Sequence, residues 1–123
     1  MADDARMIEL LELTIQLTRN GHVKWEADDT DESVYWLDRS AGVMVVESVD
    51  GDGVRPFRFG IVPNRSSSMF LESIEQVLVD SNWTNPALED LYSAARRSAL
   101  NVDPILDGLI DEFRSLSDRP GRP

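Results

Sequence analysis

The stretch that decides the fold is VMVVESVDGDGVRPFRFGIV, residues 43–62. Residues 43–49 and 56–62 are rich in β-branched and aromatic side chains, and Asp50-Gly51-Asp52-Gly53 joins them. Asp-Gly favours a hairpin, because the turn needs residues that accept a positive φ. Along 56–62 apolar side chains alternate with Arg58 and Gly60, which predicts a strand with one apolar face. A lone hairpin is marginal in water, so other elements must cover that face.

Further strands are predicted on both sides of this hairpin. Residues 23–27 and 34–38 precede it with short connections, and sequential strands usually pair, so an antiparallel meander is the simplest topology. Residues 69–80 fit either a helix or a fifth strand, and periodicity alone does not decide between them. We favour a strand at 69–75, followed by an irregular connection through Asn82 and Trp83.

Three helices are expected at the two ends of the chain. Residues 2–20 end at Gly21, which is a typical helix-terminating glycine. Asn85-Pro86 and Asp103-Pro104 each read as a capping residue followed by a proline in the first turn. We therefore predict an α+β fold with an N-terminal helix, an antiparallel four- to five-stranded meander and two C-terminal helices that pack back on the sheet. Residues 1–117 form a single domain in this interpretation, and residues 118–123 a disordered tail.

Composition narrows the classes of partner and compartment. The 123 residues contain no Cys and carry a net charge of −11, from 23 acidic and 12 basic residues. Such a surface repels phosphates and anionic lipid head groups, so we expect neither nucleic acid nor membrane as a partner. It favours a basic protein partner, or serves solubility alone. Without a signal peptide, a membrane-spanning run or Cys, the chain is expected to be cytoplasmic.

Two groups of residues are candidate partner-binding sites. Asp28, Asp29, Asp31 and Glu32 place four carboxylates in one turn, where they either pair with a basic partner or remain solvated. Alternation places Tyr35 and Trp36 on opposite faces of the sheet. One of these two aromatic side chains then either lies outside the core as a binding anchor or is covered by a further helix.

Catalytic machinery is not predicted. His22 is the only histidine, and no second His and no Cys accompany it, so a transition-metal site is not expected. The run Ser66-Ser67-Ser68 lacks the G-x-S-x-G pattern of a serine nucleophile. We expect no catalytic residue, no cofactor and no metal site, and hence no enzyme.

The first predicted helix carries more apolar surface than one sheet face needs. Its apolar arc includes Leu13 and Leu17. Either the third helix covers them, or they bring two copies together as a homodimer.

Three segments together carry a resemblance to a family. They are the hairpin, Leu17-Thr18-Arg19-Asn20-Gly21-His22-Val23-Lys24-Trp25 and Leu91-Tyr92-Ser93-Ala94-Ala95-Arg96-Arg97-Ser98-Ala99-Leu100. The chain resembles small uncharacterised bacterial domains with an L-T-x-x-G-x-V-x-W opening and a late L-Y-x-x-A-R-R helix. The resemblance implies an adaptor that accompanies effectors in bacterial conflict or defence systems. We therefore expect a non-enzymatic protein-interaction domain, the alternative being an acidic inhibitor or immunity-type protein that neutralises a basic or nucleic-acid-binding partner.

Overall fold

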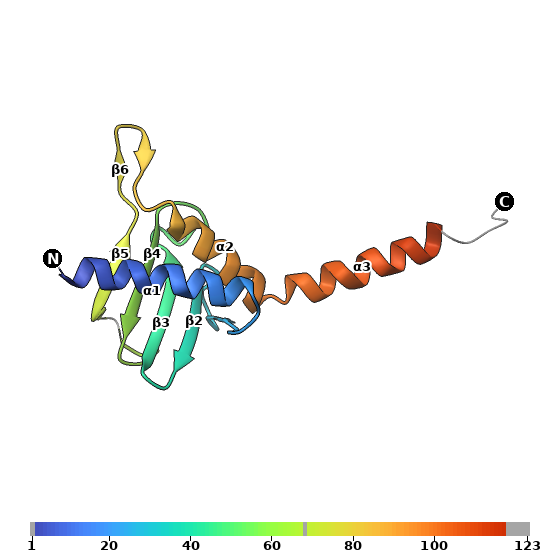
Figure 1. Cartoon of the computed structure of the whole chain (residues 1–123), viewed down its shortest axis with the longest axis horizontal. Coiled ribbons are helices and arrows are strands. Elements are labelled where there is room, and N and C mark those ends of the chain that lie inside the picture. Colours follow the sequence, from blue (N-terminus) through green and yellow to red (C-terminus); the bar gives the residue numbers. More distant parts are fainter. Residues whose placement is uncertain (1, 68, 118–123) are drawn as a thin grey trace.

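The computed structural model describes residues 2–67 and 69–117, and the tail expected at 118–123 lies outside them. It shows a five-stranded antiparallel sheet in the order β1-β2-β3-β4-β5, with α1 and α2 on one face and α3 extending away from the body (Figure 1). The predicted α+β class and meander topology are confirmed. The elements are α1 (Ala2–Arg19), β1 (Glu26–Ala27), β2 (Val34–Arg39), β3 (Gly42–Ser48), β4 (Phe57–Val62), β5 (Glu72–Glu75), β6 (Leu78–Val79), β7 (Asn82–Trp83), α2 (Ala87–Ala99) and α3 (Val102–Ser117).

The hairpin that decides the fold is β3–β4, with Val45 opposite Gly60 and Val46 opposite Phe59. Its connection is longer than a two-residue turn, and Gly51 and Gly53 both take a positive φ there. The Ser48 hydroxyl closes this loop, because it donates to the Val54 carbonyl at 2.8 Å and accepts from the Gly53 amide at 3.2 Å. The Asp-Gly residues thus make the turn for the reason that the sequence indicated.

The main core lies between the helices and the helix-facing side of the sheet. Leu11 of α1 and Leu88 and Leu91 of α2 are buried against Val46 and Phe59. The Tyr92 ring stacks on Phe57, with centroids 4.3 Å apart. The other face of the sheet has a smaller cluster of Trp36, Val45 and Val62, against which Phe70 packs. A loop residue, and not a helix, therefore covers the second face.

Several boundaries differ from those predicted. β1 is confined to Glu26–Ala27, because the Trp25 amide donates to Ser98 Oγ of α2 at 3.0 Å and not to a strand. A strand does follow the β4 loop, but it covers only Glu72–Glu75. The expected irregular connection contains a small hairpin, β6–β7. Asn85 is not a cap: it has a φ of +52° and its carbonyl accepts from the Leu88 amide.

The largest difference concerns α3. This helix was expected to pack back on the sheet, yet none of its residues is buried. The sheet face is already covered by α1 and α2, and only Leu100 and Asn101 separate α2 from α3. The helix itself forms where predicted, but the helix-facing side of the sheet has no room left for it.

Candidate interaction surface

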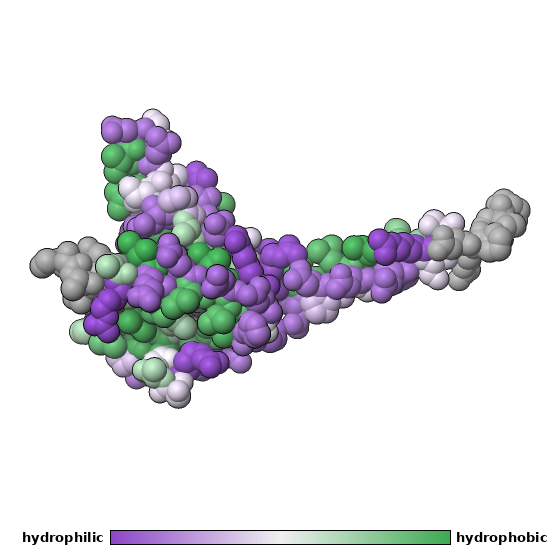
Figure 2. All heavy atoms as spheres, in the orientation of Figure 1, coloured by the Kyte–Doolittle hydropathy of each residue, from purple (hydrophilic) through white to green (hydrophobic). Residues whose placement is uncertain are grey.

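The largest group of exposed, large apolar side chains on a described helix belongs to α3. They share one side of the helix and are 42–65% exposed: Ile105, Leu106, Leu109, Ile110, Phe113 and Leu116. We call these six residues the α3 stripe. Figure 2 shows apolar side chains along one edge of α3, with hydrophilic ones beside them. An amphipathic helix normally buries such a side against a neighbour.

Spacing and charge within α3 are those of a helix that packs on another helix. Leu106, Leu109, Phe113 and Leu116 follow one another at intervals of three and four residues, which keeps them on one face. Asp107 and Asp111 point to the opposite side of the helix by the same geometry. The stripe is therefore free of charge at its centre.

The junction between α2 and α3 is held by Lys24, which follows α1 in the chain, and by an ion pair between the two helices. Lys24 donates from Nζ to the Ser98 carbonyl at 2.8 Å and to Oδ1 of Asn101. Asn101 takes a φ of +54°, a conformation that Asn tolerates better than most residues. Arg97 of α2 and Asp103 of α3 form an ion pair across the junction. These contacts direct α3 away from the body.

Two of the three segments on which the resemblance rests, residues 17–25 and 91–100, meet at this junction. The Trp25 indole is fully buried and donates to Thr18 Oγ1 at 2.9 Å. Gly21 has a φ of +76°, and the His22 amide donates to the Leu17 carbonyl at 2.9 Å. A hollow of about 400 Å³ lies between this turn and Pro104 at the start of α3. The motif residues thus form one structural joint between α1, α2 and α3.

A second exposed apolar row lies on α1. Leu13 and Leu17 are 47% and 42% exposed, while Leu10 is partly buried against the core. All three project from the same side of the helix, because they are spaced by three and four residues. The third helix does not cover Leu13 and Leu17, so the first of the two alternatives set out for them is wrong.

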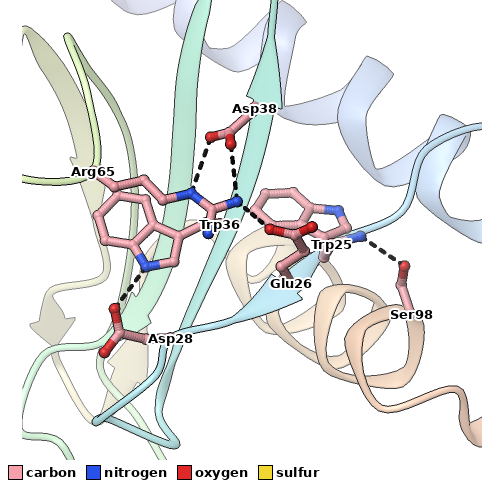
Figure 3. Close-up of polar contacts among 7 residues, drawn as sticks. All are labelled: Trp25, Glu26, Asp28, Trp36, Asp38, Arg65 and Ser98. Atoms are coloured by element: carbon pink, nitrogen blue, oxygen red, sulfur yellow. Dashed lines mark hydrogen bonds and ion pairs between the residues drawn. The ribbon is translucent and has the colours of Figure 1, made fainter.

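Tyr35 and Trp36 are not exposed binding anchors. They do lie on opposite faces of the sheet as predicted, but they are only 2% and 8% exposed. Figure 3 shows the Trp36 indole, which donates to Asp28 Oδ1 at 2.9 Å and lies beneath Arg65. The loop after β4 supplies this cover, which is why a count of helices could not reveal it.

Arg65 fastens that loop to the sheet edge. Its guanidinium binds both carboxylate oxygens of Asp38, at 3.1 and 2.9 Å, and also Glu26 (Figure 3). The hydrogen bond to Asp38 raises the pKa of Arg65 above its ordinary value. On the same face, burial raises the pKa of Glu47 although Arg58 lies 3.1 Å away. These charged groups serve the packing of the second face.

The acidic turn has two kinds of carboxylate. Asp28 Oδ2 accepts from the amides of Thr30 and Asp31 at 3.0 Å each, and Asp31 Oδ1 accepts from the Ser33 amide at 2.9 Å. The hydrogen bond from Trp36, followed by that from the Thr30 amide, lowers the pKa of Asp28 below 3.8. Asp29 and Glu32 are exposed. Half of the candidate partner-binding carboxylates therefore build the turn itself.

The remaining candidates for chemistry are Tyr92, His22 and clusters of metal-binding side chains. The Tyr92 hydroxyl donates to the Ser33 carbonyl at 3.1 Å, and burial raises the pKa of Tyr92 to about 12. His22 is exposed. In the described ranges 2–67 and 69–117, no three His, Cys, Asp or Glu side chains gather closely enough to hold a metal ion.

The β6–β7 hairpin is a further exposed element that the sequence did not indicate. It projects from the body, and Leu78 and Val79 at its strands are about half exposed (Figure 1). Each strand has only two residues, too few for any periodicity to be read. The exposure of the α3 stripe could not be predicted for a different reason, because an amphipathic stripe looks the same whether it faces a core or a partner.

Among the described residues, no helix has the length and apolar character needed to cross a membrane. No protein-family model, curated protein or solved structure matches the chain.

Proposed function

We propose that the protein is a non-enzymatic protein-interaction or adaptor domain whose main binding surface is the α3 stripe. The body formed by α1, α2 and the sheet is the scaffold that presents this helix. The single observation that carries the proposal is that all six large apolar side chains of the stripe are exposed on a helix with no buried residue.

The energetics favour an occupied stripe. Burying one such side chain fully contributes roughly 1.5–3 kcal/mol, and about half of each is still exposed. Covering the stripe therefore contributes on the order of 5–9 kcal/mol before the cost of association is subtracted. This is of the same order as the cost of association, so the partner's own apolar surface, which is buried in the same contact, must supply the surplus.

The helix itself also needs a partner. Isolated helices of this length are marginal in water, and Gly108 weakens α3 by about 1 kcal/mol relative to Ala. The junction with α2 steadies its first turn, but most of its 16 residues have no tertiary support. A surface that gains order on binding is typical of regulatory interactions.

The resemblance stated above indicates where to look for the partner. Adaptors of that kind accompany effectors in bacterial conflict or defence systems, so a bacterial cytoplasm is the setting that we propose. Charge supports a protein partner and not nucleic acid, because the chain carries a net charge of −11.

A retention experiment tests the proposal. Extract of the native host is passed over immobilised wild-type protein, over Leu109→Glu with Phe113→Glu, and over the matched control Asp107→Asn with Asp111→Asn. We expect proteins that wild type and control retain and that the stripe variant does not. Retention of the same proteins by all three would refute α3 as the binding surface.

A further inference from the structure

We infer that the occupant of the α3 stripe is a second copy of this chain, with the α3 of each copy docked on the Leu10, Leu13 and Leu17 row of the other copy's α1. This inference rests on the proposed function, since it names the partner of the same surface. It requires a two-fold symmetric dimer in which the two α3 helices are exchanged reciprocally.

The two surfaces match in spacing and length. Leu10, Leu13 and Leu17 follow one another at intervals of three and four residues, as do the central residues of the α3 stripe. Rows of this kind interlock when two helices pack at a shallow angle. From the rise per residue, α3 is about 24 Å long and α1 about 27 Å, so one helix can cover the other along its whole row.

The chain cannot satisfy both surfaces by itself in this conformation. Lys24 and the Arg97–Asp103 ion pair hold the α2–α3 junction, and α3 leaves the body near the C-terminal end of α1 (Figure 1). Laying α3 on its own α1 would require the chain to reverse at Asn101 and give up these contacts. A second copy, turned by 180°, brings its α3 back along α1 in the antiparallel sense without any change at the junction.

Charged residues lie outside the centre of this contact. The net charge of −11 opposes association in general, yet Asp107 and Asp111 lie on the far side of α3. Arg6 extends the α1 row towards the N-terminus, and Glu112 borders the α3 stripe in its C-terminal half. With Leu109 opposite Leu13, antiparallel helices place Glu112 opposite Leu10 and Leu116 opposite Arg6.

The area also favours exchange over a simple pairing of two α3 helices. A fully buried side chain of this size removes roughly 60–120 Å² of apolar surface from water. Exchange covers the six stripe residues together with Leu13 and Leu17 in both copies, which amounts to roughly 500–1,000 Å² of remaining apolar surface. With the polar rim included, the contact reaches the ~1,000 Å² of a specific interface. Pairing α3 with α3 covers about a quarter less and leaves Leu13 and Leu17 exposed.

The absence of Cys makes a direct test straightforward. Purified full-length Leu13→Cys and Leu109→Cys proteins are prepared, the latter with a tag that changes its size, and are mixed and treated with a short bis-maleimide. We expect a cross-linked species that contains one chain of each kind. The matched control is Asp111→Cys on the opposite side of α3, for which the cross-link to Leu13→Cys should be lost.

Other results of the same experiment would overturn the inference. A cross-link between two Leu109→Cys chains would show that the stripe pairs with the α3 of another copy. An intrachain cross-link in a protein that carries both Leu13→Cys and Leu109→Cys would show that α3 packs on the chain's own α1. A mixture without cross-links, from protein that sediments as a monomer at 100 µM, would remove the second copy as occupant. That last result would refute the dimer but not the proposed function, because the retention experiment tests the stripe without requiring self-association.

Discussion

At the scale of single residues, the second face of the sheet depends on how closely Phe70 approaches Gly60. A Cβ atom at Gly60 would lie 2.2 Å from the Phe70 ring and 2.9 Å from the Glu72 carbonyl oxygen. Phe70 in turn lies beneath Arg58, whose guanidinium is 5.1 Å from the ring centroid. Gly60 lies within strand β4 of the hairpin, and its lack of a side chain is therefore required for packing and not for a turn.

We predict that Gly60→Ala lowers the free energy of unfolding by roughly 1–3 kcal/mol, because the added methyl group displaces Phe70. Urea denaturation with an unchanged slope measures this loss. Gly42→Ala is the control, since the nearest atom to its new Cβ is 3.9 Å away. Equal effects of the two substitutions would contradict the packing of Phe70 on the strand.

Asp28 supplies a prediction on pH. Its folded-state pKa is lowered by the Trp36 and Thr30 hydrogen bonds, so ionised Asp28 stabilises the fold above its ordinary pKa of 3.8. This contribution is lost as the pH falls through the lowered folded-state pKa. The stability advantage of wild type over Asp28→Asn should therefore shrink between about pH 5 and pH 2. Asp29→Asn changes the same charge in the same turn, and an equal trend there would refute the role of Trp36.

At the scale of elements, α3 is the one helix that forms without a core to pack on. Gly108 lies in its interior, and a Cβ added there would meet no atom within 4 Å. The wheel geometry places it away from the stripe. The helix is consequently weakened at a position that packing does not require.

We predict that Gly108→Ala stabilises α3 by roughly 0.5–1 kcal/mol and increases the helical signal in far-ultraviolet circular dichroism of dilute protein. It should also tighten any association through the stripe, since less ordering remains to be done on binding. A loss of helical signal would show that Gly108 is needed for a bend or a close contact in α3.

Much of the element order could be predicted from local pattern. The β3–β4 hairpin, Gly21 at the end of α1 and the opposite orientation of Tyr35 and Trp36 follow from turn chemistry and strand alternation. The extent of β1 could not be predicted, because the Trp25 amide donates to Ser98, 73 residues later in the chain. The coverage of Trp36 by Arg65 and the exposure of the α3 stripe are likewise tertiary outcomes. The spacing of the apolar residues in α3 is visible in the sequence, but the sequence contains no local signal for what covers them.

At the scale of the whole molecule, the protein is a covered sheet with one helix extending from it (Figure 1). Of the partner-binding residues that the sequence suggested, Tyr35 and Trp36 are buried, and Asp28 and Asp31 build a turn. Leu13 and Leu17 are exposed, and self-association through them stays a prediction. On the described helices, the large exposed apolar side chains lie on α1 and α3.

The most direct test of the central claim, that α3 is unpartnered until it binds, is hydrogen exchange of its amides followed by mass spectrometry at increasing protein concentration. The account predicts fast exchange in α3 and slow exchange in α2 at submicromolar protein, with α3 becoming protected at about 100 µM as copies associate. In Leu109→Glu with Phe113→Glu, α3 should exchange quickly at every concentration while α2 is unchanged. Exchange in wild-type α3 as slow as in α2 at every dilution would contradict the claim, because the helix would then be packed within its own chain.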